Sequence, residues 1–82
     1  MHYVYIVRCA DGTLYTGYAR DPIARVEIHN RRKGAQYTAS RSPVALVYLE
    51  GFAQKGDALQ REYELKQLPR AGKEAVVATA AG

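Results

Sequence analysis

The chain has 82 residues, which is enough for one hydrophobic core but not for separate catalytic and specificity domains. Hydrophobic residues make up 48% and charged residues 24% of it, so a disordered or fibrous protein is excluded and a single domain over residues 1–82 is expected. Twelve Lys and Arg against eight Asp and Glu give a net charge of +4, which favours polyanionic partners without requiring one.

Cysteine usage and hydropathy indicate a cytoplasmic protein. The single cysteine, Cys9, has no partner for an internal disulfide, and the first residues lack the basic start and long apolar run of a secretory signal. The longest apolar stretches, residues 44–49 and 75–81, are far shorter than the ~20 residues that cross a bilayer. One Cys and two His cannot supply the four ligands of a structural zinc site. We therefore expect no membrane span and no zinc.

The N-terminal part of the chain predicts a β-hairpin. Residues 2–9 and 14–19 are rich in Val, Ile and Tyr, and Asp11-Gly12 between them is a strong turn signal. Because side chains alternate along a strand, Tyr5 and Tyr15 share a sheet face only if the loop has an odd number of residues. A two-residue loop would pair Arg8 with Tyr15 and separate the tyrosines, whereas a three-residue loop of residues 11–13 would unite them and pair Tyr15 with Cys9.

A helix is expected next, over residues 22–31. Asp21 can cap it and Pro22 suits its first position. Side chains at helical spacing continue it: Ile23, Val26 and Asn30. The following residues, 32–43, have no periodicity and predict a polar loop.

The rest of the chain predicts one strand and two helices. Residues 44–49 form a continuous apolar run, typical of a strand buried on both faces. Asp57 can cap a helix that reaches residue 68 before Pro69 stops it, and residues 70–80 predict a short last helix. The expected class is α+β, a small three-stranded, mainly antiparallel sheet flanked by helices in the order ββαβαα.

Glu62 is unusual for its position on the second predicted helix. On a helical wheel it falls in the middle of the stripe expected to face the core, whereas Glu64 points outward. The other members of that stripe are Ala58, Leu59, Leu65 and Leu68. A carboxylate in such a place needs a cation or an ion pair. The sequence leaves open a Mg²⁺ ion and a structural pair with Arg25 or another basic group.

The motif residues occur in a recognisable order. Tyr3-Val4-Tyr5 and Tyr15-Thr16-Gly17 lie on the two predicted strands, followed by Arg25 and His29 on the first helix and Glu62 on the second. This set resembles the GIY-YIG nuclease family, and residues 8–17 are similar, nearly residue by residue, to its small stand-alone bacterial subfamily (UPF0213-like). The resemblance covers residues 3–68. The chain departs from the family pattern at Tyr3, which replaces Gly, and at Tyr18, where some members carry Lys.

The resemblance implies Mg²⁺-dependent, endonuclease-like hydrolysis of nucleic-acid phosphodiester bonds, with DNA as the expected substrate. Glu62 would hold the one divalent ion, and Tyr15, ahead of Tyr5, would activate the attacking water. Arg25 would stabilise the charge of the transition state, and His29 would orient the water or the phosphate. Further residues would contact nucleic acid: Gly17, Arg31, Arg32, Lys33 and Arg41.

Most of these residues also have a purely structural explanation. Tyrosines are common in half-buried strands, Gly17 can let a helix approach the sheet, and residues 31–33 suit a solvated helix end. The alternative functions are a non-catalytic nucleic-acid binding module and a partner subunit on the same fold. Because the chain has no second domain for DNA recognition, we expect weak substrate choice or a partner protein that supplies targeting.

Overall fold

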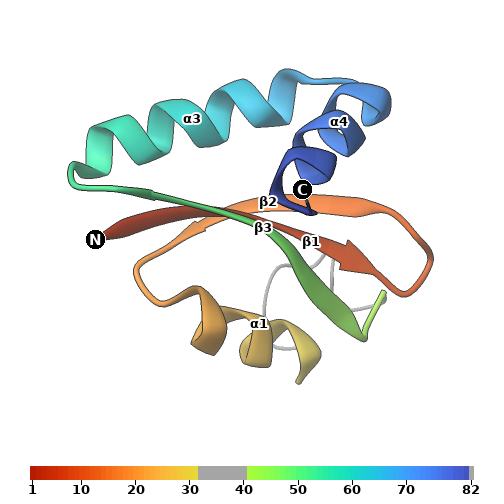
Figure 1. Cartoon of the computed structure of the whole chain (residues 1–82). Coiled ribbons are helices and arrows are strands. Elements are labelled where there is room, and N and C mark those ends of the chain that lie inside the picture. The colour runs from red at the N-terminus through yellow and green to blue at the C-terminus, as the bar shows by residue number, and fades with distance from the viewer. Residues whose placement is uncertain (32–40, 82) are drawn as a thin grey trace.

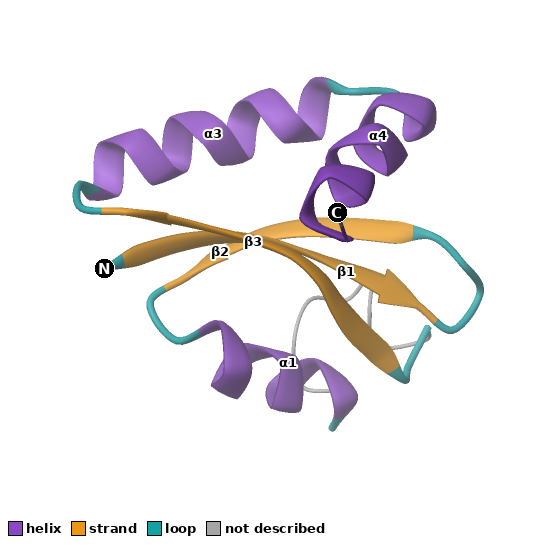
Figure 2. Cartoon of the chain, in the orientation of Figure 1, coloured by secondary structure: helices purple, strands orange, loops and turns teal. Residues whose placement is uncertain are grey.

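The computed structural model describes residues 1–31 and 41–81. Its elements are β1 (His2–Cys9), β2 (Leu14–Ala19), α1 (Pro22–Asn30), β3 (Val44–Phe52), α3 (Lys55–Gln67) and α4 (Arg70–Ala81). The three strands form one antiparallel sheet in the order β2-β1-β3. Helix α1 covers one face of this sheet, and α3 and α4 cover the other (Figure 1, Figure 2). The expected class and element order are confirmed.

The hairpin loop between β1 and β2 has three residues, 10–12. The amide of Cys9 donates to the carbonyl of Thr13 at 2.8 Å, and the amide of Gly12 donates to the carbonyl of Cys9 at 2.9 Å. Gly12 has φ 86°, in the left-handed region that glycine adopts without strain and that ends many three-residue hairpin loops. The odd loop length matches the expectation that unites Tyr5 and Tyr15.

The position of that loop differs from the expected one. It begins one residue earlier, so Tyr15 pairs with Val7 rather than with Cys9. The side chain of Asp11 accepts hydrogen bonds from the amide and hydroxyl of Thr13, at 3.1 and 2.6 Å. These bonds hold Thr13 in the ladder instead of the loop. The pairing moves by two residues, and the tyrosines therefore keep their common face.

The central strand is β1, and four consecutive side chains in it, Val4, Tyr5, Ile6 and Val7, are at most 1% exposed. The expectation that the third strand is buried on both faces is wrong. Among the residues that the structure describes, strand β3 pairs only with β1 and forms a sheet edge, where Leu49 is 44% exposed. Its run of β-prone residues extends to Phe52, three residues beyond the predicted end.

The face under α3 and α4 carries the larger apolar core. Its buried members are Val4, Ile6, Leu14, Ala58 and Leu65. Helix α3 begins at Lys55 after Gln54, whose side chain makes no capping hydrogen bond. The predicted cap, Asp57, lies instead in the first turn, where its negative charge suits the positive end of the helix dipole. The helix ends at Gln67, because Pro69 cannot continue it.

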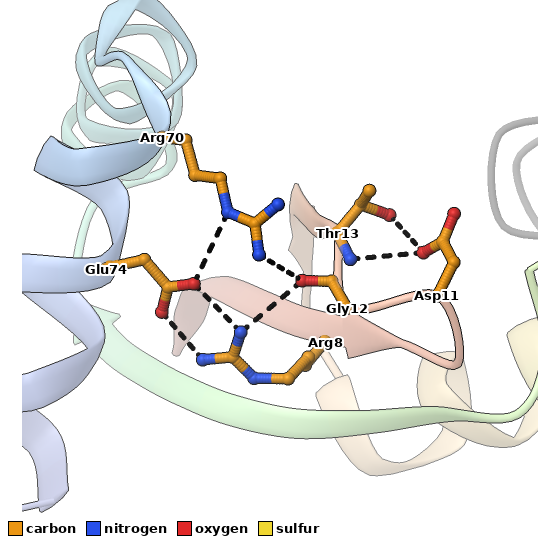
Figure 3. A network of polar contacts seen from close by, with 6 residues as sticks. All are labelled: Arg8, Asp11, Gly12, Thr13, Arg70 and Glu74. Carbon is orange, nitrogen blue, oxygen red and sulfur yellow. Dashed lines mark hydrogen bonds and ion pairs between the residues drawn. The ribbon is translucent and has the colours of Figure 1, made fainter.

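A polar network joins α4 to the hairpin loop (Figure 3). Arg8 of β1 donates two hydrogen bonds to the carboxylate of Glu74, at 2.9 and 2.7 Å. Arg70 donates to the carbonyl of Gly12 at 3.1 Å. The arginine at position 8 lowers the pKa of the Glu74 carboxyl. The C-terminal helix thus holds the loop that sets the register of β2.

Helix lengths also bear on the membrane question. Within residues 1–31 and 41–81, no helix is both long and apolar enough to cross a bilayer.

Candidate functional site

Two tyrosines and a histidine meet on the α1 face of the sheet. Tyr5 pairs with Gly17 and Tyr15 pairs with Val7, so both tyrosines point to the same face. The hydroxyl of Tyr5 lies 3.0 Å from Nε2 of His29, within hydrogen-bond distance. The ring of Tyr15 meets the imidazole edge-on, with centroids 5.5 Å apart. Side chains from β1, β2 and α1 therefore form one cluster.

Gly17 makes room for this cluster. A Cβ atom built at Gly17 would lie 2.5 Å from Cζ of Tyr5 and still closer to its hydroxyl oxygen. The ring of Tyr5 thus crosses from the central strand to Gly17 on the edge strand β2. Neither explanation offered from sequence, a bound phosphate or a packed helix, included this one. A nucleic-acid contact at Gly17 stays a prediction.

Helix α1 is rotated so that His29 faces the sheet. His29 is 1% exposed, whereas Ile23, expected to belong to the helix's apolar stripe, is 62% exposed. Asn30 fixes the end of the helix, since its side chain accepts from the amide of Val44 at 2.6 Å and donates to the carbonyl of Val44 at 3.2 Å. The hydroxyl of Ser42 also donates to the carbonyl of His29 at 3.1 Å. No local signal in the sequence indicates this anchoring role, because it depends on a contact across 14 residues.

Burial shifts the titration of both hydrogen-bonded groups. Burial and the neighbouring Tyr15 raise the pKa of Tyr5 to about 12, while the positive charge of Arg25 acts in the opposite direction. Burial, with a smaller contribution from Arg25, lowers the pKa of His29. At neutral pH the histidine is therefore held in its uncharged form, which can accept a proton, and the tyrosine keeps its own.

Arg25 lies one turn before His29 on α1 and is exposed. Its charge influences the pKa of both Tyr5 and His29, so it lies in electrostatic range of both. In the part of the chain that the structure describes, its guanidinium has no ion-pair partner within 4 Å. A cation in this setting is available to an anionic ligand.

Glu62 comes from α3, on the opposite face of the sheet from α1 (Figure 1). Its side chain is 19% exposed and pairs with Lys66 at 3.2 Å, not with Arg25. The carboxylate nevertheless contributes to the raised pKa of Tyr5. This influence is possible because the Tyr5 hydroxyl reaches β2, an edge strand that α3 also contacts.

The wheel-based prediction for α3 is correct in part. Ala58 and Leu65 are fully buried, but Leu59 is 40% exposed. Glu64 points outward as expected and pairs with Arg61 at 3.5 Å. Glu62 occupies the border of the buried stripe, so solvent and small ions can reach its carboxylate.

Among residues 1–31 and 41–81, no three His, Cys, Asp or Glu side chains gather closely enough to hold a metal ion by themselves. Mg²⁺ does not require such a cage, because it keeps several waters and often binds through one or two carboxylates and substrate phosphates. A single, partly exposed carboxylate at Glu62 fits that mode of binding.

The basic residues expected to contact nucleic acid are only partly described. Arg31 follows α1 and lies 4.0 Å from Glu27, and Arg41 pairs with Asp11 at 3.1 Å. Arg32 and Lys33 lie outside the described residues. Contact of these four residues with nucleic acid stays a prediction.

The comparisons with known proteins agree with this fold. A family profile described as the GIY-YIG catalytic domain matches residues 1–75. The chain belongs to the GIY-YIG family, whose catalytic domain indicates a nuclease that acts on nucleic acid.

Its similar relatives carry the name UPF0213, as the hairpin motif predicted. UPF0213 proteins from strains of Staphylococcus aureus are 61% identical over 69 residues, which is 84% of this chain and 84% of theirs. The solution NMR structure of a UPF0213 protein from Bacillus halodurans is 46% identical, with a TM-score of 0.63, and covers 95% of this chain and 83% of that one. A second NMR structure, from E. faecalis, is 39% identical with a TM-score of 0.65 and the same coverage.

Proposed function

We propose that this chain is a Mg²⁺-dependent endonuclease that hydrolyses phosphodiester bonds, with DNA as its substrate. The observation that carries the proposal is the cluster of Tyr5, Tyr15 and His29, in which a tyrosine hydroxyl lies 3.0 Å from a neutral imidazole. Arg25 and Glu62 both act electrostatically on that hydroxyl. A packing role for the tyrosines alone would not require these charged groups around them.

The two tyrosines differ in exposure, and the proposed roles follow that difference. Tyr15 is partly exposed and can touch the attacking water and the substrate. Tyr5 is buried, and we assign its hydroxyl as the donor to Nε2 of His29, 3.0 Å away. A tyrosine with a pKa of about 12 is a poor base on its own. In this arrangement Nε2 of the neutral His29 can take the hydroxyl proton of Tyr5 while the Tyr5 oxygen receives the proton that the water loses.

The charged groups would act on the phosphate. The guanidinium of Arg25 would bind the non-bridging oxygens and stabilise the charge that develops on them. Glu62 would hold one Mg²⁺ ion, which supplies further charge neutralisation at the scissile phosphate when it is bound. Since the basic excess of the chain is small, binding should be weak and should fall as salt rises.

The test is the substitution Glu62→Gln, with Glu64→Gln on the same helix as the matched control. Glu62→Gln keeps the size of the side chain and removes its charge, so Mg²⁺-dependent cleavage of labelled DNA should be lost while nucleic-acid binding survives. The melting temperature should change little, because the i,i+4 pair of the half-buried Glu62 with the exposed Lys66 lies at the helix surface, where such pairs contribute only about 0.3–0.5 kcal/mol. Glu64→Gln should cleave like the wild type.

Two outcomes would contradict the proposal. Normal cleavage by Glu62→Gln would remove the metal-binding role. A wild type that binds DNA and RNA but cleaves neither, with or without Mg²⁺, would favour the binding module.

A further inference from the structure

A cavity of about 440 Å³ lies beside the candidate site, at the turn from β2 to α1. Residues of β2, of the turn, of α1 and of the start of α3 surround it, and they include Arg20, Arg25 and Lys55. Its volume lies within the ~300–1,000 Å³ typical of small-ligand sites, so it can hold a phosphate together with part of a sugar. Arg25 is the residue that it shares with the candidate site.

The Lys and Arg side chains that line this cavity differ from most others in the described residues, because they have no carboxylate within 4 Å. The described part of the chain contains ten Lys and Arg side chains, and six of them have a carboxylate within 4 Å: Arg8, Arg31, Arg41, Arg61, Lys66 and Arg70. The remaining four, within those residues, are Arg20, Arg25, Lys55 and Lys73. Three of these four line the same cavity.

The one carboxylate that lines the cavity is already engaged. Asp21 accepts the amide of Ala24 at 3.1 Å and thereby caps α1. At the edge of the cavity, burial lowers the pKa of His2, and the positive charges of Arg20 and Lys55 lower it further. His2 in turn lies 2.7 Å from the hydroxyl of Tyr18, a further lining residue. Three cations against the single negative charge of Asp21 leave the described lining of the cavity with a net positive charge, which an anionic ligand would reduce.

We propose that this cavity binds a backbone phosphate of the nucleic acid adjacent to the phosphate that is cleaved, through Arg20 and Lys55. The inference rests on the proposed function, because Arg25 would face the scissile phosphate from one side and the cavity from the other. The backbone would then pass over the turn between β2 and α1. Ile28, 39% exposed at the rim, gives the sugar an apolar surface.

The test compares charge-removing substitutions at cations inside and outside this cavity. Arg20→Gln and Lys55→Gln are made, with Lys73→Gln as the control, since Lys73 is also without a carboxylate partner in the described residues but lines a different cavity. Binding of a labelled oligonucleotide is measured against salt in EDTA, so that cleavage does not enter. Each cavity variant should lower the salt slope by about 1, as expected for one lost phosphate contact.

The double variant adds a second criterion. If Arg20 and Lys55 hold the same phosphate, Arg20→Gln/Lys55→Gln should lose little more of the salt slope than either single variant. Lys73→Gln should keep the wild-type slope. Melting temperatures establish that all variants are folded. Equal losses in Lys73→Gln, or unchanged slopes in both cavity variants, would overturn the inference.

The source of the phosphate is distinguished by two competitors. Inorganic phosphate and a nucleoside monophosphate are added while the ionic strength of the binding assay is kept constant. Neither should displace the oligonucleotide if the cavity binds a backbone phosphate. Displacement by either one that Arg20→Gln abolishes would identify a free-anion site and overturn the proposal. A wild type that binds as predicted without cleaving would refute the proposed hydrolysis only, and a wild type that binds no nucleic acid would refute both.

Discussion

The two faces of the sheet differ in the polarity of the side chains that they bury. Under α3 and α4 the buried side chains are apolar apart from Thr16, with Val4, Ile6 and Leu65 at 0% exposure. Under α1 the buried side chains include Tyr5 and His29, each 1% exposed. A buried polar group is costly unless it has a hydrogen-bond partner, and here each supplies the partner of the other. The face under α3 and α4 therefore contributes mainly to stability. The face under α1 carries the hydrogen-bonded pair of Tyr5 and His29, which belongs to the candidate site.

This difference explains how so small a domain can hold a candidate site. The apolar face is covered by two helices of 13 and 12 residues, whereas α1 has only 9. The central strand β1 serves both faces at once, because its alternating side chains supply Val4 and Ile6 to one and Tyr5 and Val7 to the other. Substitutions on the two faces should therefore separate stability from activity.

The largest expected effect on stability is on the apolar face. Leu65→Ala removes a fully buried side chain and should lower the free energy of unfolding by about 2–5 kcal/mol. Urea titration at 25 °C measures this loss. The fraction of molecules that stays folded should keep the specific activity of the wild type in the cleavage assay. If the folded molecules of Leu65→Ala have a lower specific activity than the wild type, the two faces are not independent.

A smaller loss of stability with a larger loss of activity is expected on the α1 face. Gly17→Ala places a Cβ where the Tyr5 ring lies, so the ring must move and its hydrogen bond to His29 must break. Overpacking of this kind costs about 1–3 kcal/mol. Gly56→Ala is the matched control, because a Cβ there meets nothing within 4 Å. The control should be neutral or slightly stabilising, and wild-type cleavage by Gly17→Ala would refute the role of the Tyr5 and His29 pair.

The smallest expected effect is a pH dependence of stability that arises from the α1 face. His29 has a lowered pKa in the fold, so protons bind more readily to the unfolded chain. Stability should be constant above the ordinary histidine pKa near 6.5 and should fall as the pH drops below it. Urea midpoints between pH 5 and 8 measure this slope.

The second histidine of the chain provides the control. His29→Gln should remove the larger part of the slope and His2→Gln the smaller part, because the pKa of His2 is also lowered but its side chain is less buried. A slope that disappears with His2→Gln instead would contradict the burial argument.

Local signals in the sequence were enough to predict the hairpin and the first helix. The Asp11-Gly12 turn, the Asp21 cap and Pro22 each act over a few residues, and the hairpin and α1 lie where they predict. The order of the motif residues likewise predicted the family that the comparisons show.

What the sequence could not supply depends on contacts between distant segments. The edge position of β3 follows from the strand order, and the burial of His29 in place of Ile23 follows from how α1 is rotated on the sheet. The ring of Tyr5 over Gly17 and the cavity that joins Arg20 with Lys55 are equally tertiary. No periodicity within one element encodes them.

The three-residue hairpin loop has a consequence for how such domains can change in evolution. Inserting or deleting one residue between Cys9 and Thr13 would turn Tyr15 and Gly17 to the α3 face and bring Thr16 to the α1 face. The strand would still pair, but the aromatic cluster would be lost in a single step. Two residues can be added or removed together without that exchange. Descendants of this hairpin that preserve the cluster should therefore vary in loop length by even numbers, unless a bulge in β2 restores the parity.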